Sequence, residues 1–385
     1  MFELVSAHRL FKSNLIINLI SATLIGTCIF AYGLVFAAIR EVKYARTRCG
    51  EIAEAKGVYY YEAYDSLKPR YEIINELYKV KGVCYKGSVS GKADGKAILI
   101  ESLSSEMYNQ MPLELSKGKW PLTTPEDKIY VVATANCGYD VGEEIIIDIE
   151  ESKLKVYVAG ILSDDSDTYR FSGFTKPMTF SALFTEKEDR QGMIYIYVNE
   201  TFLSKEITKY LSKPNAVVVL FEDDISESEY NDQIQKLESK GNVFTLDEIR
   251  KNTMLKEQEY KNLFMPSVSV LSLMAVCSSL AAVLITVKKS EKHLRIMKLI
   301  GASPLKVAVT MELLSVIMAV VAVFVSFLLW KIGTAFLMLS GSAVNVCYVK
   351  SVFGVLAAYL LAQTALVAAI SQKGVKQIEL GGREE

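Results

Sequence analysis

Residues 290–312, SEKHLRIMKLIGASPLKVAVTME, form a short charged stretch that separates two long apolar runs of the chain. Its first half has the spacing of an amphipathic helix. Basic residues recur on one face at i, i+4 and i+7: Lys288, Lys292 and Arg295. Apolar residues recur every three positions on another face: Leu294, Met297 and Ile300. The pattern predicts a short helix that lies along a membrane face.

The middle of this stretch predicts a sharp turn into a second helix. Gly301 suits the left-handed conformation that ends many helices. Ser303 is a good N-cap, and Pro304 fits the first helical position, where no backbone donor is needed. The alternative interpretation is a positively charged loop that only fixes the topology of the chain.

Four apolar runs are long enough to cross a bilayer core of about 30 Å. Residues 15–39 and 263–287 carry no charge, residues 313–330 form a third run, and Lys350 and Lys373 bracket a fourth. The first run is longer than the apolar region of a signal peptide, which spans roughly 7–15 residues. We therefore interpret it as an uncleaved first span, preceded by an interfacial helix.

Basic residues indicate the orientation of the spans. They gather between the second and third spans and after the fourth: Lys288, Lys289, Lys292, Arg295, Lys298, Lys306, Lys373, Lys376 and Arg383. The rule that cytoplasmic loops are positive predicts that both termini lie in the cytoplasm. A second group follows span one on the predicted outer side and disagrees with the rule: Arg40, Lys43, Arg46 and Arg48. Long domains translocate largely regardless of charge, so the prediction is kept.

Residues 295–314, RIMKLIGASPLKVAVTMELL, resemble the signature that follows the second span in FtsX/MacB-type ABC transporter permeases. The matching residues are Arg295, Lys298, Leu299, Gly301, Ala302, Ser303 and Glu312. Lys298 stands where many members have arginine. The resemblance implies a coupling helix and turn that dock on a cytoplasmic ATPase, made of Glu291, Arg295, Lys298, Leu299, Ile300, Gly301, Ala302 and Ser303.

Glu312 is the acidic residue near the start of the third span. One interpretation is an interfacial carboxylate paired with Lys306 or with a partner. The other is a fixed polar contact that transmits movement of the coupling helix, because charges inside membranes tend to be functional. The residues leave both open.

Residues 41–262 predict a soluble domain between spans one and two. Helices that continue the neighbouring spans outward as a stalk are expected at 41–56 and 247–262. Helix and strand patterns near both ends of the insert indicate a split α/β, porter-like subdomain: helices at 67–79 and 227–239, strands at 84–89, 216–222 and 242–246. The fold class is therefore membrane α-helical, with four transmembrane helices, plus an extracytoplasmic α+β domain.

The middle of the insert predicts a small β-rich subdomain, with strands at 96–102, 128–133, 145–150, 154–162 and 193–199. Its LSKGKWP motif and the following strands resemble the MacB-type periplasmic core. The matching residues are Gly118, Trp120, Val141, Gly142, Glu143, Val156, Val158, Gly160 and Ile161, with Glu143 where aspartate is usual. Gly142 suits a tight turn. Any small β-barrel is the alternative interpretation.

Residues 171–180, FSGFTKPMTF, form an aromatic loop that contains a proline. Phe171, Phe174 and Phe180 are candidates for contact with a substrate or partner. The alternative is that the loop packs on its own domain.

Composition excludes several classes of function. A net charge of −1 gives no indication of nucleic-acid binding, and His8 and His293 are too few for a histidine metal site. The six cysteines show no metal-binding spacing. Cys49, Cys84 and Cys137 lie in the insert; if it is outside the cell, one disulfide can form and one thiol is left over, and the sequence does not decide which.

No catalytic motif is present. Residues 87–93, GSVSGKA, have three residues between the glycines and Ala93 where a phosphate-binding loop needs Ser or Thr. We therefore expect no cofactor in this chain and no enzyme activity of its own, with ATP and Mg²⁺ bound by a partner ATPase.

The resemblance implies the permease subunit of a type VII, mechanotransmission ABC system that crosses the plasma membrane of a bacterium several times. Its expected partners are a cytoplasmic ATPase of the MacB, LolD or FtsE kind, a second permease copy or paralogue, and membrane lipids. The output is efflux or extraction of a hydrophobic, peptide or lipoprotein-like substrate. The alternative is an FtsX-like regulator of extracellular cell-wall hydrolases that transports nothing, and a more remote one is a membrane receptor without an ATPase.

The predicted domain bounds follow from these elements. They are 1–14 for the interfacial helix, 15–40 for span one, 41–262 for the external domain, 263–287 for span two, 288–303 for the coupling helix and turn, 304–338 for span three, 339–350 for a short external loop, 351–372 for span four and 373–385 for the cytoplasmic tail.

Overall fold

The computed structural model describes residues 2–62, 72–122, 128–163, 166, 168–171, 178–185, 194–212, 214, 216–289, 303–336 and 342–381. The chain divides into two compact units. We call Met1–Ile39 with Glu259–Glu385 the helical unit, and Arg40–Gln258 the α+β unit. The insert predicted from the sequence, residues 41–262, has nearly the same bounds as the α+β unit.

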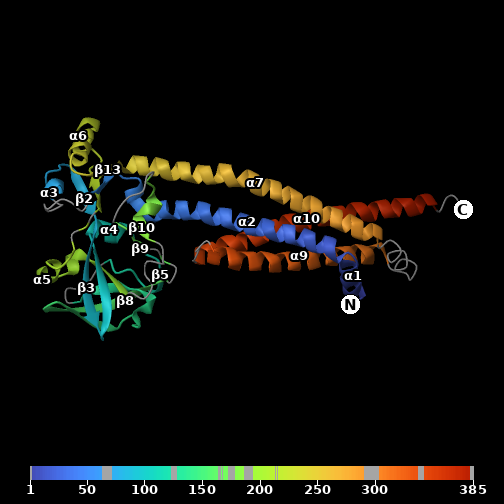
Figure 1. Cartoon of the computed structure of the whole chain (residues 1–385), viewed down its shortest axis with the longest axis horizontal. Helices are drawn as coiled ribbons and strands as arrows, with labels where there is room; N and C mark the ends of the chain where they lie inside the picture. Colours follow the sequence, from blue (N-terminus) through green and yellow to red (C-terminus); the bar gives the residue numbers. More distant parts are fainter. Residues whose placement is uncertain are drawn as a thin grey trace. The chain divides into compact units, whose positions relative to one another are not determined.

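Long apolar helices make up the helical unit (Figure 1). Its elements are α1 (Phe2–Ser13), α9 (Pro304–Phe336), α10 (Ser342–Gly381) and the greater parts of α2 (Leu15–Arg48) and α7 (Leu246–Lys289). Residues 40–48 of α2 and 246–258 of α7 belong to the α+β unit. By length and composition, α2, α7, α9 and α10 can each cross a membrane. The prediction of four spans joined to an α+β domain is confirmed, and the chain is a membrane protein.

Glycines bring α2 and α9 into close contact. A Cβ atom added to Gly26 would lie 2.7 Å from the carbonyl oxygen of Ala322. One added to Gly33 would lie 2.7 Å from the ring of Trp330, and one added to Gly333 would lie 2.7 Å from the ring of Phe30. Small residues allow helix backbones to approach each other closely in lipid. A larger side chain at these positions would force the two helices apart.

Polar side chains also link the helices of this unit. Between α2 and α7, Ser21 Oγ lies 2.9 Å from Ser278 Oγ. Between α10 and α7, the buried Gln363 donates from Nε2 to Ser279 Oγ at 3.0 Å. Such interhelical hydrogen bonds add stability where helices gain nothing from hiding apolar surface from lipid.

A four-stranded sheet forms one part of the α+β unit, with the order β13-β1-β12-β2. Its strands are β1 (Gly57–Tyr61), β2 (Val80–Cys84), β12 (Ala216–Phe221) and β13 (Asn242–Thr245), and all neighbours are antiparallel. Strands from the beginning and the end of the insert therefore meet in one sheet, which confirms the predicted split α/β subdomain.

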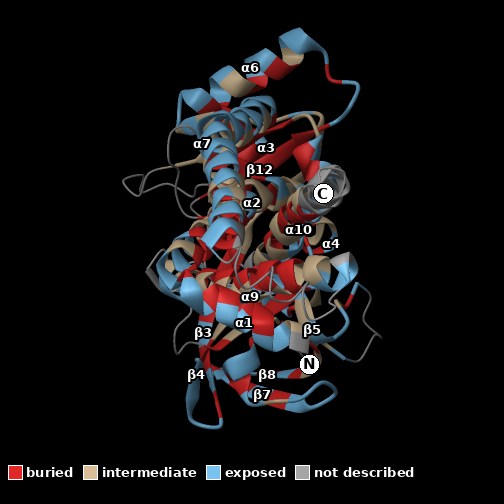
Figure 2. Cartoon of the chain, turned by 90° about the vertical axis from the view of Figure 1, so that its right-hand side faces the viewer, coloured by how far each residue is buried: buried red, intermediate tan, exposed pale blue. Residues whose placement is uncertain are grey.

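Strand β12 is buried on both faces of this sheet (Figure 2). Its alternate residues enter two different hydrophobic clusters. Ala216, Val218 and Leu220 face the central core, whose other members include Ala45, Cys49, Ile52, Tyr59, Cys84, Met107, Tyr108, Phe171, Phe180, Leu246 and Ile249. Val217, Val219 and Phe221 face the opposite side, with Val58, Tyr60, Tyr230 and Leu237. This two-sided burial explains why the strand reads as an unbroken apolar run.

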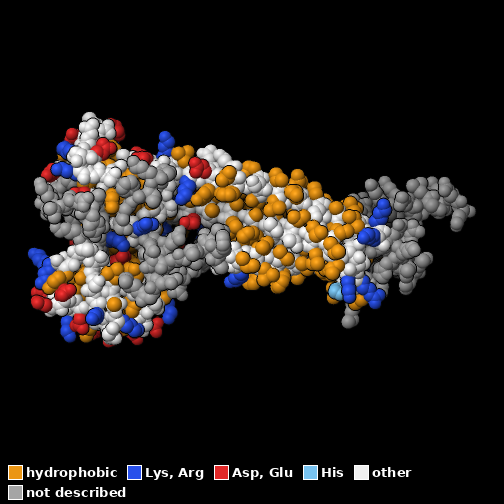
Figure 3. Space-filling model, viewed as in Figure 1, with side chains coloured by type: hydrophobic (Ala, Val, Ile, Leu, Met, Phe, Trp, Pro, Cys, Tyr) orange, Lys and Arg blue, Asp and Glu red, His pale blue; other side chains and the backbone are white. Residues whose placement is uncertain are grey.

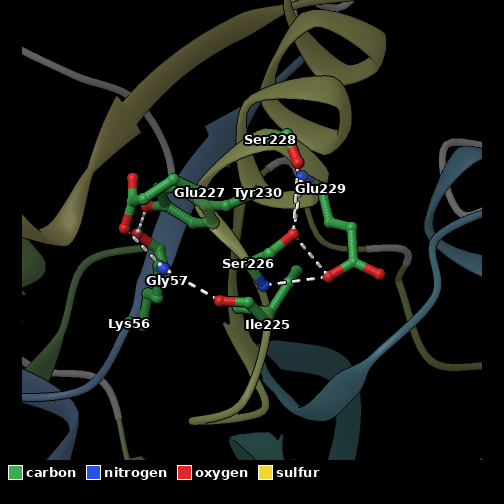
Figure 4. Close-up of polar contacts among 8 residues, drawn as sticks. All are labelled: Lys56, Gly57, Ile225, Ser226, Glu227, Ser228, Glu229 and Tyr230. Atoms are coloured by element: carbon green, nitrogen blue, oxygen red, sulfur yellow. Dashed lines mark hydrogen bonds and ion pairs between the residues drawn. The ribbon is translucent and has the colours of Figure 1, made fainter.

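Helix α6 (Glu227–Glu238) covers that opposite side of the sheet and begins with a capping box. Ser226 Oγ accepts a hydrogen bond from the Glu229 backbone, and the Glu229 carboxylate accepts one from Ser226 N at 2.9 Å (Figure 4). Two backbone donors that the first turn would leave unpaired are thereby satisfied. These bonds lower the pKa of the Glu229 carboxyl.

Two side chains fasten α6 to strand β1 (Figure 4). Tyr230 OH donates to the Gly57 carbonyl at 2.9 Å. The Lys56 ammonium donates to the Ile225 carbonyl at 3.2 Å and pairs with Glu227 at 2.8 Å. The start of the helix is therefore fixed in position on the sheet.

A seven-stranded sheet forms the second part of the α+β unit, with the order β5-β8-β6-β11-β4-β3-β7. Because β7 pairs with both β3 and β8, six of the strands close into a barrel, and β5 extends it beside β8. The strands are β3 (Lys86–Ala93), β4 (Lys96–Leu103), β5 (Leu115–Gly118), β6 (Tyr130–Ala133), β7 (Glu144–Ile149), β8 (Ser152–Leu162) and β11 (Ile194–Asn199).

Alternating residues fill the barrel interior. In β7, Ile145, Ile147 and Ile149 are buried, whereas Glu144 and Asp148 face outward. The inward residues join a third hydrophobic cluster, the barrel core, with Val131, Val156, Val158, Ile196 and Cys137 among its members. The predicted small β-rich subdomain is confirmed as this barrel.

Short elements complete the described part of the α+β unit. They are η1 (Gly50–Ala53), α3 (Glu72–Asn75), α4 (Ser105–Gln110), η2 (Ala135–Cys137), β9 (Thr168–Tyr169), η3 (Phe180–Leu183), β10 (Phe184–Thr185), η5 (Glu200–Phe202) and α5 (Lys205–Thr208).

The helix predicted at residues 41–56 is wrong in its second half. Helix α2 ends at Arg48, and Gly50 has a φ of +55°, which starts the separate turn η1. Of the helix predicted at 67–79, the structure describes only the part from residue 72 onward. In that part, helix α3 covers Glu72–Asn75, and strand β2 begins at Val80. Residues 67–71 lie outside the described residues.

Candidate functional site

Most of the predicted coupling helix lies outside the described residues. This holds for Glu291, Arg295, Lys298, Leu299, Ile300, Gly301 and Ala302. Ser303 is described, and it is the N-cap of α9: its side-chain oxygen accepts from Lys306 N at 3.4 Å, and its carbonyl accepts from the same nitrogen at 2.9 Å. The predicted cap, with Pro304 as the first helical residue, is confirmed.

Helix α1 packs against this first part of α9. Leu10 of α1, Met311 of α9 and Val367 of α10 form a small buried cluster, with Val307 and Ala308 beside it. The start of α9, which Ser303 caps, is therefore held between α1 and α10.

Glu312 lies in α9 one residue beyond this cluster and is half-buried. Its Oε2 accepts a hydrogen bond from Thr364 Oγ1 of α10 at 3.5 Å. The contact ties α9 to α10 close to the capped start of α9. Neither interpretation of Glu312 made from the sequence is decided by it.

Charge on the helical unit is concentrated at the end where α1 lies (Figure 3). Exposed basic residues there come from three helices: Arg9 and Lys12 of α1, Lys288 and Lys289 of α7, and Lys306 of α9. Orange apolar side chains cover the visible faces of the helices beyond them (Figure 3). An apolar band with a basic end is what a membrane-spanning bundle requires.

A second charged group lies in the α+β unit, where α2 ends and α7 begins. Arg46 of α2 pairs with Glu54 at 2.6 Å, and Arg250 of α7 approaches the same carboxylate at 3.6 Å. Arg250 Nε also donates to the Ala53 carbonyl at 2.9 Å, and its guanidinium pairs with Asp247. The hydrogen bond from Arg46 lowers the pKa of the Glu54 carboxyl.

Lys43 and Glu257 add a further pair between the two helices, at 3.3 Å. We call Lys43, Arg46, Glu54, Arg250 and Glu257 the helix-end junction. A cavity of about 350 Å³ lies within it, lined by Lys43, Arg46, Thr47, Gly50, Ala53, Glu54, Thr253, Met254 and Glu257. In the junction, charged side chains join the outgoing and the returning helix, beside the apolar contacts that Ala45 and Ile249 make in the central core.

Sequence reasoning did not identify this junction. The feature of the sequence that could have indicated the junction is the basic group Arg40–Arg48, which disagreed with the positive-inside rule. Two of those residues, Lys43 and Arg46, have acidic partners in the junction. The spacing of the sequence could not reveal that Glu54, Arg250 and Glu257 lie beside them.

The aromatic loop needs a correction. Phe171 is 2% exposed and Phe180 is fully buried, and both belong to the central core. Phe180 N donates to Thr253 Oγ1 of α7 at 3.1 Å, so the end of the loop is fixed against that helix. Neither side chain is available for contact with a substrate or partner in this structure. Phe174 lies outside the described residues.

The residues that carry the resemblance to a periplasmic core have structural roles. Gly118 and Gly142 have φ values of +80° and +95°, a conformation that favours glycine. Trp120 Nε1 donates to the Tyr108 carbonyl at 2.9 Å, and the two rings pack with centroids 4.8 Å apart. Within the described residues, no group of three or more His, Cys, Asp or Glu side chains is arranged to hold a metal ion.

The fold and the junction define a membrane protein whose α+β domain is inserted between its first two spans. Solved structures similar to it include the periplasmic region of MacB from Actinobacillus actinomycetemcomitans, with 14% identity, a TM-score of 0.31, and coverage of 52% of this chain and 92% of that one. A second is the extracellular domain of the noncanonical ABC-type transporter YknZ from Gram-positive bacteria, with 13% identity, a TM-score of 0.28, and coverage of 50% and 98%.

A third similar structure is a domain of a putative permease protein from Porphyromonas gingivalis, with 12% identity, a TM-score of 0.26, and coverage of 49% of this chain and 81% of that one. No protein-family model matches the chain, and no curated protein matches it.

Proposed function

We propose that this chain is the permease subunit of an ABC transport system in which a separate cytoplasmic ATPase drives work done by the α+β unit outside the membrane. One observation carries the proposal. Helices α2 and α7 each continue without a break from the helical unit into the α+β unit. Helix α2 contributes Cys28 to the core of the helical unit and Ala45 to the central core of the α+β unit. Helix α7 supplies Ala275 and Ile249 in the same way.

This continuity supports mechanical transmission. A helix changes length little, so movement at its base is carried to its far end. Helix α7 contains Pro266, which has no N–H to donate to the preceding turn, so the hydrogen-bond ladder of this helix lacks one bond there. The helix-end junction ties α2 to α7 at the level of Arg46 and Arg250, so that the two helices move the α+β unit together. The work has no need of a pore for substrate through the bilayer.

The energy for this movement is assigned to a partner. Residues 87–93, the nearest sequence to a phosphate-binding loop, form strand β3, and Lys92 pairs there with Asp148 of β7 in the barrel ladder. A phosphate-binding loop instead turns its backbone amides toward the nucleotide. ATP and Mg²⁺ are therefore assigned to the ATPase, which would dock on the segment that contains Glu291, Arg295 and Ile300.

We assign the output to efflux or extraction of a hydrophobic, peptide or lipoprotein-like substrate. The described part of the α+β unit contains a four-stranded sheet, a seven-stranded sheet, the two-stranded sheet of β9 and β10, and three hydrophobic clusters, and this gives the moving helix pair a large folded domain to displace. Both termini would lie in the cytoplasm, with the basic end of the helical unit facing it.

The first test is co-purification from mild detergent, with Ile300→Asp compared with Ile146→Asp. Ile146 is 52% exposed in β7, so the control adds the same charge to the surface of the α+β unit. We expect an ABC ATPase to be recovered with the wild type and with the control, and to be lost with Ile300→Asp. Failure to recover an ATPase with the wild type in several detergents would overturn the proposal.

A deletion strain then separates the two outputs. Raised sensitivity to drugs or peptides, or loss of a secreted substrate, is expected for a transporter. Unchanged sensitivity with filamentous or chained cells would instead identify a regulator of cell-wall hydrolases.

A further inference from the structure

The cysteines of the α+β unit fall into two different cores. Cys49 and Cys84 are fully buried and belong to the central core. Cys137 is 1% exposed and belongs to the barrel core, where its Sγ accepts from Tyr139 N at 3.4 Å. Of the three, the pair that shares a core is Cys49 with Cys84. Both are free thiols in this structure, and their shared core makes them the candidate pair among the three.

Helix α4 brings this pair to one place. Cys49 is followed by Gly50, and a Cβ atom there would lie 2.8 Å from the carbonyl oxygen of Gln110, the last residue of α4. A Cβ atom on Gly82 would lie 2.5 Å from Cγ of Glu106, near the start of α4. Glu106 and Gln110 are one helical turn apart, which is about 6 Å along the axis. The turn after α2 and strand β2 therefore meet at the same short helix.

The side chain of Cys84 points into this meeting place. Gly82 and Cys84 are two residues apart in β2, so both face the side of the sheet that α4 covers. Cys84 is the register partner of Val218 of β12, which also belongs to the central core. Burial raises the pKa of the Cys84 thiol, and the nearby Glu106 and Cys49 raise it further.

We propose that Cys49 and Cys84 are joined by a disulfide in the mature protein. The bond would tie the end of α2 to the edge strand β2 of the four-stranded sheet. This inference rests on the proposed function, because that function places the α+β unit outside the cytoplasm, where oxidants of the disulfide class are present.

The chemistry is thiol–disulfide exchange. The Cys49 thiolate attacks the disulfide of the oxidant and forms a mixed disulfide, which releases one thiol of the oxidant. The Cys84 thiolate then displaces the second sulfur and forms the Cys49–Cys84 bond. Both cysteines lose a proton, and their two electrons remain on the oxidant as a dithiol. Burial raises the pKa of the Cys49 thiol to about 12, so the exchange would occur during folding, before the central core closes.

The test is peptide mapping of the full-length protein. Cells are treated with a thiol-alkylating reagent, and the purified chain is denatured in the same reagent without reductant and digested. We expect a Cys49–Cys84 cross-linked peptide and complete alkylation of Cys137. Cys137→Ser is the matched control and should leave the cross-link unchanged. Alkylation of both Cys49 and Cys84, or a cross-link to Cys137, would overturn the proposal.

Thermal unfolding gives a second measurement. Reductant should lower the Tm of the wild type by roughly 10 °C, because the bond closes a loop of more than thirty residues. It should leave the Tm of Cys49→Ser unchanged. Equal shifts in both proteins would contradict the proposal.

Failure of this inference can be told apart from failure of the proposed function. The purified chain is opened in urea with oxidised glutathione and returned to detergent. If the pair links there but is reduced in cells, the disulfide in the mature protein is wrong, and co-purification of the ATPase then decides separately whether the proposed function stands. If it links in neither, only the disulfide is wrong, provided that the ATPase still co-purifies.

Discussion

The helical unit and the α+β unit are stabilised by different kinds of contact. In the α+β unit, large side chains such as Phe221 and Tyr59 are fully buried in cores between sheets and helices. In the helical unit, Leu263 and Leu361 are more than 60% exposed, and the helices meet through glycines such as Gly26. Burial of apolar area drives folding in water but gives little between helices in lipid. One unit should therefore be sensitive to lost volume and the other to added volume.

The largest effect is expected when volume is removed from the α+β unit. Phe221 is fully buried and packs edge-on against Tyr230, with ring centroids 5.4 Å apart. Phe221→Ala should lower the free energy of unfolding by about 3–5 kcal/mol. Urea unfolding of the full chain in detergent, followed by tyrosine fluorescence, measures this. Ile146→Ala, on the exposed face of β7, should change the value by less than about 0.5 kcal/mol. Equal losses would contradict the comparison.

A larger side chain should lower the stability of the helical unit at Gly26 but not at Gly354. In Gly26→Leu the new side chain meets the Ala322 carbonyl, and the overpacking should cost about 1–3 kcal/mol. Gly354→Leu in α10 meets nothing within 4 Å and is the matched control. Thermal stability in detergent and protease resistance of the α2–α9 pair measure the difference. Equal tolerance of both variants would mean that the close approach of α2 and α9 does not matter.

The helix-end junction should respond to loss of charge with a smaller effect. Arg250→Ala removes the hydrogen bond to Ala53 and the pairing with Glu54, at a cost of about 1.5 kcal/mol. Lys251→Ala, at the next and exposed position of α7, should be neutral. If the junction transmits force, Arg250→Ala should also weaken the coupling of ATP hydrolysis to output. An unchanged coupling together with lost stability would leave the junction a purely structural feature.

The smallest expected effect is a dependence on pH at the start of α6. The pKa of Glu229 is lowered by bonds from Ser226 and by Lys79, so its stabilising contribution is fully present above the ordinary carboxyl pKa of 4.5. It is lost as the pH falls through the lowered value in the folded state. Glu229→Gln should therefore destabilise the chain slightly at pH 7 and much less at pH 3. Parallel loss at both pH values would mean that the charge is not the cause.

The spans and most strands could be predicted because their signals are local. Charge-free runs identify α2, α7, α9 and α10, and alternation identifies β7 and β8. The sequence analysis did not predict strand β1, because its residues GVYYY follow a stretch that was predicted to be helical. These residues form a strand because they pair with β12 and β13. Those partners lie at the far end of the insert, beyond the reach of a local pattern.

The candidate site was predictable only in part. The cap at Ser303 followed from the chemistry of serine and proline at a helix start. For the aromatic, proline-containing loop with Phe171 and Phe180, the sequence left open both contact with a substrate or partner and packing on its own domain. The burial of these residues depends on Tyr59 and Thr253, which come from distant parts of the chain. The helix-end junction escaped prediction for the same reason.

The nested order of the two sheets has a consequence for synthesis. Strands β1 and β2 are made first, the whole barrel from β3 to β11 follows, and β12 and β13 come last. The early strands of the four-stranded sheet must therefore wait, with unpaired edges, until the chain has passed through the barrel. Such late, non-local pairing slows folding and exposes the nascent chain to aggregation. The barrel can form before the four-stranded sheet is complete. A stalled or truncated chain should therefore accumulate with a folded barrel and with unpaired, aggregation-prone strands β1 and β2.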